Sequence, residues 1–138
     1  MRLHGQCLCG AIAYEVEQLD GPIVHCHCKT CCHCKTWRKA HASAFASTAR
    51  VMRENFRWLK GEATVRPYAS SPTKNRWFCP LCGSHLMAER PVQPHVILRV
   101  ATLDEDPRTR PAMHIWTAHK VPWLTAPPGT PHFHETPE

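Results

Sequence analysis

Short runs of alternating apolar and polar residues recur along most of the chain. In residues 11–17, AIAYEVE, isoleucine, tyrosine and valine fall on one face and the two glutamates on the other, which is typical of a strand with one buried side. Residues 55–61, NFRWLKG, alternate in the same way and end at a glycine. Further strands are predicted at residues 23–28, 43–51, 64–70, 75–79, 85–90, 95–103 and 113–119.

These segments predict a mainly β fold. Pro67 cannot donate a backbone hydrogen bond, so the strand that contains it is expected at the edge of a sheet. Residues 26–40 fit either a short helix or a loop organised by a metal, and both interpretations stay open. Five prolines within the last 18 residues predict an irregular tail from about Val121. We therefore expect a single domain over residues 1–138, with one or two short helices at most.

Nine cysteines in 138 residues are the most unusual feature of the composition. No stretch approaches the roughly 20 apolar residues of a membrane span, and the N-terminus lacks the apolar run of a signal peptide. We therefore expect a cytoplasmic protein, in which clustered cysteines are metal ligands rather than disulfides. The spacing agrees, because neither a Cys-x-Cys pair nor the adjacent Cys31 and Cys32 easily meets disulfide geometry.

Two cysteine clusters have the form of zinc-binding turns. Cys7 and Cys9 are followed by a glycine, and so are Cys79 and Cys82. A glycine at this point permits the left-handed backbone that lets N–H groups point at sulfur. Two such turns predict a closed tetrahedral site of four thiolates, which suits a structural zinc whose binding energy is folding energy.

The third cluster lies in a six-residue tandem repeat, with CHCKTC at 26–31 and CHCKTW at 32–37. The first copy offers three thiols, from Cys26, Cys28 and Cys31. Three protein ligands leave a fourth position for water or a substrate thiolate, as in catalytic zinc sites.

The second copy ends in Trp37 where the first has its third cysteine, so we expect the zinc in the first copy, with Cys32 and Cys34 free. The alternative is a mixed site in which one of those two cysteines, or a nearby histidine, is the fourth ligand. Such a closed site would abolish catalysis. The histidines concerned are His25, His27 and His33.

The order of these motifs resembles that of one known family. The segments are GQCLCGAIAYE near the start, then HCHCKTC, FRWLKGE, RWFCPLCGS and ATLDEDP, and finally HIWTAHKVPW. Together, over residues 3 to about 133, they resemble the glutathione-dependent formaldehyde-activating enzyme family, which includes the centromere protein V group.

The resemblance implies a β-rich fold like that of methionine sulfoxide reductase B and its relatives, with two zinc ions per chain. The family chemistry joins the thiol of glutathione to formaldehyde, which gives S-hydroxymethylglutathione, and is classed with carbon–sulfur lyases. Matched residue by residue, the structural zinc ligands are Cys7, Cys9, Cys79 and Cys82, and the catalytic zinc ligands are Cys26, Cys28 and Cys31.

The tandem repeat departs from the family pattern. The spacing from Cys9 to Cys26 keeps the first copy in register, whereas the segment CHCKTWRKAHASAF continues as the family does from the second copy. We interpret this as a six-residue tandem insertion. Six extra residues would turn a helix by about 600° or move a strand by about 20 Å, so we expect them to loop out. Ala42 stands where the family usually has glycine.

The formal net charge of +6 gives only weak support for nucleic acid binding. Thiolates on two zinc ions would lower it to about +3. Residues 50–76 hold seven Lys or Arg against two Glu, which fits a solvated strand face or, as a functional interpretation, attraction of an anionic thiol such as glutathione. The histidines at 132 and 134 are expected at the surface. Core or pocket-wall positions are expected for Trp58, Trp77, Trp116 and Trp123.

The sequence therefore predicts a zinc-dependent carbon–sulfur lyase-like enzyme that acts on a small thiol, glutathione, with formaldehyde or a related aldehyde. One alternative is a non-catalytic zinc-stabilised module that binds nucleic acid or protein. Another is a degenerate family member that keeps only the structural zinc. The fourth coordination position separates them, because an exchangeable ligand favours the enzyme and a closed shell the module.

Overall fold

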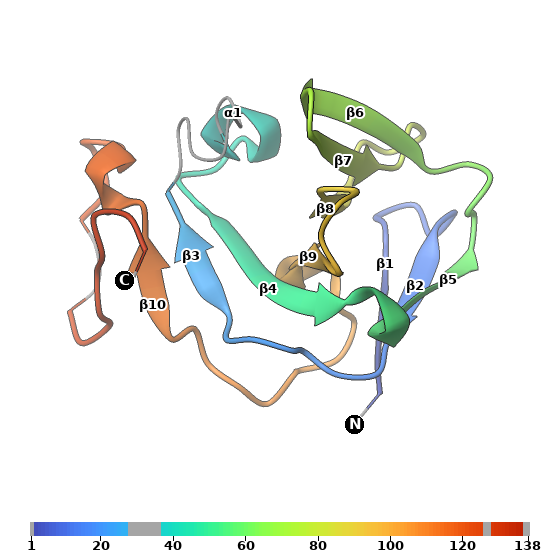
Figure 1. Ribbon diagram of the computed structural model, residues 1–138, viewed down its shortest axis with the longest axis horizontal. Coiled ribbons are helices and arrows are strands. Elements are labelled where there is room, and N and C mark those ends of the chain that lie inside the picture. The colour runs from blue at the N-terminus through green and yellow to red at the C-terminus, as the bar shows by residue number, and fades with distance from the viewer. Residues whose placement is uncertain (1, 28–36, 126–127, 137–138) are drawn as a thin grey trace.

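The structure is a computed structural model that describes residues 2–27, 37–125 and 128–136. Within these residues the chain forms two β-sheets and a few short helices (Figure 1), so the mainly β fold is confirmed. None of the described helices is long and apolar enough to cross a membrane.

The smaller sheet has three antiparallel strands in the order β1 (Leu3–Gln6), β2 (Ala13–Val16) and β5 (Phe56–Lys60). The larger sheet has seven strands, in which β10 and β3 run parallel and every other neighbouring pair is antiparallel. Its order is β10 (Met113–Ile115), β3 (Val24–Cys26), β4 (Ala46–Met52), β9 (His95–Arg99), β8 (His85–Glu89), β7 (Lys74–Phe78) and β6 (Arg66–Ser71). The described helices are α1 (Trp37–His41) and the 3-10 turns η2 (Arg53–Asn55), η3 (Val100–Thr102) and η4 (Thr117–His119).

The core lies between the two sheets, and Tyr14 of β2 is at its centre. Its side chain is fully buried, and its ring stacks on Phe56 and meets Trp58 edge-on. The Thr102 hydroxyl donates to the Arg99 carbonyl at 2.8 Å, so the Tyr14 hydroxyl, 2.6 Å away, donates to Thr102. This hydrogen bond ties the small sheet to η3, which follows β9 of the large sheet.

Strand alternation gives the large sheet two different faces. On β4 and β9, Val51, Val96 and Leu98 belong to the core shared with the small sheet. Arg50 pairs with Ile97, and both alternate with those residues, so they point to the opposite side. One face of the large sheet is therefore free to carry polar groups.

The strands follow the sequence pattern closely, with local differences. Each predicted segment contains a strand, and β6, with Pro67, is an edge strand as predicted. β1 was not predicted, because Leu3 is its only apolar side chain. The strand predicted at 95–103 ends at Arg99 and continues as η3, and the strand predicted at 113–119 ends at Ile115 before η4.

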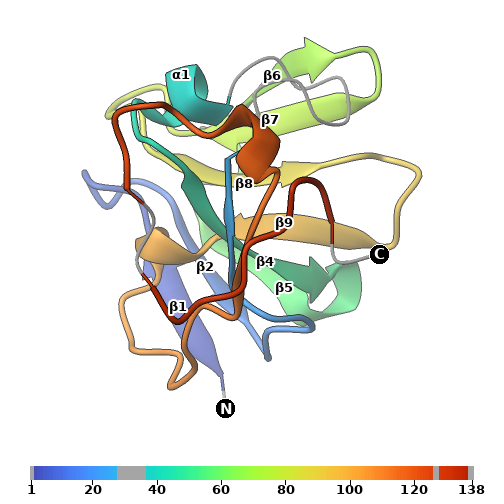
Figure 2. The same ribbon diagram turned by 90° about the vertical axis from the view of Figure 1, so that its left-hand side faces the viewer.

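The C-terminal segment is more regular than the proline content predicted. Its described end runs beside β10, with hydrogen bonds from His114 N–H to the Pro131 carbonyl at 2.8 Å and from Phe133 N–H to the His114 carbonyl at 2.9 Å. A further bond joins Trp116 N–H to the Glu135 carbonyl at 2.8 Å. Figure 2 faces this edge of the sheet, where the red segment lies in front.

Residues 26–40 were expected to form either a short helix or a metal-organised loop. The described end of this stretch is helical, in α1. The residue that follows it, Ala42, is exposed and has a φ of +52°. A left-handed residue directly after a helix is usually glycine, because a Cβ is strained there. The alanine that departs from the family pattern therefore occupies a position that favours glycine.

We predict that Ala42→Gly stabilises the protein, by about 1 kcal/mol, because it relieves this strain. Ala40→Gly is the matched control: it lies inside α1, where glycine should cost about 0.5–1 kcal/mol. Urea unfolding followed by circular dichroism measures both changes. A loss of stability in both variants would contradict the prediction.

Candidate metal centre and adjoining cavity

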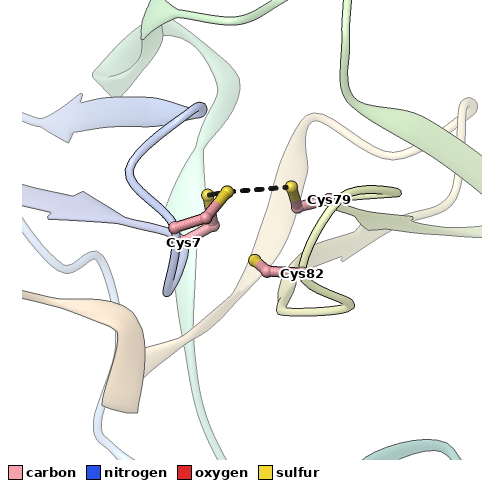
Figure 3. Close-up of side chains that lie close together, drawn as sticks. Cys7, Cys79 and Cys82 are labelled. Carbon is pink, nitrogen blue, oxygen red and sulfur yellow. Dashed lines mark hydrogen bonds between the residues drawn. The ribbon is translucent and has the colours of Figure 1, made fainter.

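Four cysteine sulfurs meet where a loop of each sheet approaches the other. Cys7 and Cys9 lie in the loop between β1 and β2, and Cys79 and Cys82 lie in the loop between β7 and β8. Their sulfur atoms all lie within 4.8 Å of one another. Figure 3 shows Cys7, Cys79 and Cys82 with their sulfurs close together between the two loops. The structure thus gathers the residues that the sequence assigns to the structural site.

The two loops share one backbone design. In each, the first cysteine donates its N–H to the carbonyl five residues later, at 3.0 and 2.9 Å. The glycine after the second cysteine donates to the carbonyl of the first, at 3.1 and 2.7 Å. These glycines, Gly10 and Gly83, have φ of +79° and +83°, the left-handed conformation that the sequence predicted.

The sulfur separations fit a tetrahedral metal. Cys7 Sγ lies 3.7 Å from Cys9 Sγ, which lies 3.8 Å from Cys79 Sγ. Four sulfurs about 2.3 Å from a central zinc lie about 3.8 Å apart. The four cysteines could therefore hold a metal ion, and a soft donor set of this kind suits zinc.

Ser84 connects the two loops and lowers the pKa of the Cys82 thiol. Its hydroxyl oxygen accepts from the Leu8 N–H at 3.0 Å and lies 3.3 Å from Cys82 Sγ. Hydrogen bonds from the Ser84 hydroxyl and N–H lower the pKa of Cys82 to about 5. At Cys9 the Ala11 N–H favours the thiolate, but burial and the neighbouring thiols outweigh it and raise the pKa to about 11. Sequence reasoning missed Ser84, although its place directly after the second turn was the available signal.

The predicted catalytic cluster is described only at Cys26. This residue, the last of β3, is buried, and Cys28 and Cys31 lie outside the described residues, as do Cys32, His33 and Cys34. Cys26 forms a small apolar cluster with Ala46, Ile97, Ile115 and Trp116.

His25 and His27 point away from the side on which Cys26 lies. His25 Nδ1 is 3.0 Å from Ser47 Oγ, and His27 Nε2 is 2.8 Å from His114 Nδ1. Burial, and then the nearby histidine charges, lower the pKa values of His27 and His114 to about 4, so this pair is neutral at pH 7. The geometry brings neither His25 nor His27 beside Cys26 as a fourth ligand.

A cavity of about 700 Å³ opens on the face of the large sheet that carries Cys26. Trp116, whose φ is +58°, forms part of its wall near Cys26, as the sequence predicted for a pocket residue. The same expectation is wrong for Trp123, which is 73% exposed. The polar residues in the lining are Asp20, Thr48, Arg50, Lys74, Arg90, Gln93, His95 and Thr136.

A second cavity, of about 410 Å³, separates α1 from the loop that carries Ser84. Arg99 Nε donates to His41 Nε2 at 3.0 Å, and the His41 ring meets His85 edge-on. Burial, followed by the charge of Arg99, lowers the pKa of both histidines. These contacts hold α1 against the large sheet through neutral histidines.

Comparisons with known proteins agree with the motifs. The sequence profile of the family described as glutathione-dependent formaldehyde-activating enzyme matches residues 2–119. An uncharacterised lyase of Schizosaccharomyces pombe is 32% identical over 82 residues, which are 59% of this chain and 53% of that protein. The chain thus spans about half the length of this curated relative. A crystal structure of a Rhodobacter sphaeroides protein, a structural genomics target, is similar with a TM-score of 0.57 and 28% identity, over 76% of this chain and 92% of that one.

We predict that Cys79→Ser removes one equivalent of zinc and lowers the free energy of unfolding by at least about 3 kcal/mol, because metal binding energy here is folding energy. Leu81→Ala is the matched control, since Leu81 lies in the same loop, is 70% exposed and offers no ligand. Elemental analysis and thermal unfolding, each with and without a chelator, measure the two effects. Equal metal content and stability in the two variants would contradict the prediction.

Proposed function

This chain belongs to the glutathione-dependent formaldehyde-activating enzyme family, and on that premise we propose that it is a zinc-dependent carbon–sulfur lyase-like enzyme. Its substrates are a small thiol, glutathione, and formaldehyde or a related aldehyde. The lyase-named relative supports the reaction class. The product of the glutathione reaction is S-hydroxymethylglutathione.

One observation carries the proposal beyond the family: Cys26, the first thiol of the candidate catalytic cluster, lines a cavity large enough for a small peptide. A metal at the four-thiol centre would have no coordination position open to a substrate, because all four ligands come from the protein. We assign it the structural zinc and assign the catalytic zinc to Cys26, Cys28 and Cys31.

The reaction needs little chemistry from the protein. The thiol sulfur attacks the aldehyde carbon, a carbon–sulfur bond forms, and the carbonyl oxygen takes the proton that the thiol loses. When bound, zinc supplies a Lewis acid that favours the thiolate form of the substrate. Ile97, Ile115 and Trp116 surround Cys26 with apolar surface, which restricts water near the reacting sulfur. The rest of the rate enhancement comes from holding the thiol and the aldehyde close together, because the same addition proceeds without an enzyme.

We predict two zinc ions per wild-type chain and adduct formation faster than the spontaneous reaction, measured by exchange NMR of glutathione and formaldehyde. Cys26→Ser should lose one zinc and reduce the catalysed rate at least tenfold, because it removes a ligand that lines the cavity. Cys34→Ser is the matched control from the second copy and should keep both zinc ions and the rate.

Three results would contradict parts of the proposal. A spontaneous rate with both zinc ions bound would exclude the enzyme, and nucleic acid binding that weakens steeply with salt would then favour the binding module. A single zinc at the four-thiol centre would indicate the degenerate family member. Zinc loss in Cys34→Ser would show a mixed site that includes the second copy.

A further inference from the structure

We propose that the end of the cavity remote from Cys26 is a carboxylate-binding site, formed by Arg50 with Lys74 and Arg90, that selects an extended anionic thiol. The inference rests on the proposed function, since it takes the substrate sulfur to lie near Cys26. It specifies the end of the cavity that binds the substrate carboxylate, and the length that the substrate must have.

The strand register gathers the basic residues at one end of the polar face. Met52 of β4 lies opposite His95 of β9. Glu89 of β8 pairs with both Asn75 and Val96, so continuing the register by one residue places Arg90 between His95 and Lys74. Arg50 precedes Met52 by two residues and therefore shares its face. Arg50, Lys74, Arg90 and His95 all line the cavity.

The charge at this end is positive. Arg50 is exposed, and within residues 2–27, 37–125 and 128–136 its guanidinium has no hydrogen-bond or ion-pair partner. Burial, and then the charges of Arg50 and Arg53, lower the pKa of His95, which leaves that ring neutral at pH 7. An anion entering the cavity would thus meet a guanidinium whose charge is available.

The acidic groups nearby are already satisfied. The Asp20 carboxylate, which lines the cavity, accepts from Gln18 Nε2 and from Met52 N–H at 2.7 Å each, and from Asn55 Nδ2 at 3.0 Å. Glu89 pairs with Arg53 at 2.6 Å and accepts from the Trp77 indole N–H. The Arg53 guanidinium offsets the charge of Glu89. Asp20 stays ionised, because its hydrogen bonds outweigh burial and lower its pKa, but Arg50, Lys74 and Arg90 outnumber it in the cavity lining.

The distance along β4 sets the length of the ligand. Cys26 lies opposite Ala46, and Arg50 is four residues further along the strand, about 13 Å at 3.3 Å per residue. The arginine side chain spans part of this distance. A tripeptide covers about 10 Å and a single amino acid about 3.5 Å, so a thiol of tripeptide length reaches both ends and a shorter one does not.

Binding of S-methylglutathione tests the site without the reaction, because its blocked sulfur cannot form an adduct. Calorimetry compares it with its diethyl ester, which has no carboxylate, and with S-methyl-N-acetylcysteine, which is anionic but short. Arg50→Gln should weaken S-methylglutathione binding about five- to tenfold and make it less sensitive to salt. The variant should fold, since Arg50 is exposed.

Two further variants sharpen the test. Arg50→Lys keeps the charge and should keep most of the affinity. Lys60→Gln removes an equal charge from an exposed position on β5 of the other sheet and should leave binding unchanged. Neither the ester nor the short anion should respond to Arg50→Gln.

Equal binding of the acid and its ester to the wild-type protein would overturn the inference, as would no binding of either. Equal losses in Arg50→Gln and Lys60→Gln would also overturn it, because the effect would then be one of net charge. Adduct formation alongside these results would leave the proposed function standing. The expected binding pattern without adduct formation would support the carboxylate site while the proposed reaction failed.

Discussion

The four-thiol cluster is the constraint on which the arrangement of the two sheets depends. The strands of the small sheet have four or five residues each, and its apolar face is buried against the large sheet. Its β1–β2 loop meets the β7–β8 loop of the large sheet through cysteines about 70 positions apart in the chain, with Cys9 and Cys79 Sγ 3.8 Å apart. The Tyr14–Thr102 hydrogen bond gives a second attachment inside the core. Together, the two attachments fix how the small sheet lies on the large one.

This packing determines which face of the large sheet can be functional. The core shared with the small sheet contains Val51, Val96 and Leu98. The residues that alternate with them point to the other face and do not pack in that core. They carry a basic character that is unusual for a buried surface, since Lys74 and Arg76 are 5% and 1% exposed. Buried cations are expensive to desolvate, so cations at such positions need partners or a function. Of the two, Lys74 lines the cavity, where it would lie near the anionic substrate that we propose.

The mainly β fold and the four-thiol cluster could be predicted from the sequence, because strand periodicity and thiol spacing are local signals. The cysteine pairs with their glycines predicted which thiols gather, and alternation predicted nine strand segments. Longer-range geometry was not accessible. The role of Ser84 requires the approach of Leu8 from the other loop, which no local pattern predicts. The φ of Trp116 carries no sequence signal, because tryptophan rarely adopts that conformation.

The metal centre and the cavity are linked through one strand. β7 begins at Lys74, which lines the cavity, and ends at Phe78, directly before Cys79 of the four-thiol cluster. β7 pairs with β8 along its length, with one register shift between Trp77 and Phe78, so the position of Cys79 constrains where Lys74 lies along the sheet. Its neighbour β8 returns from Cys82 to Glu89 and Arg90, which repeats the coupling at a second point. A metal held by these four thiols would therefore bear on the cavity without being part of it, by holding the register of the two strands that carry basic residues into the lining.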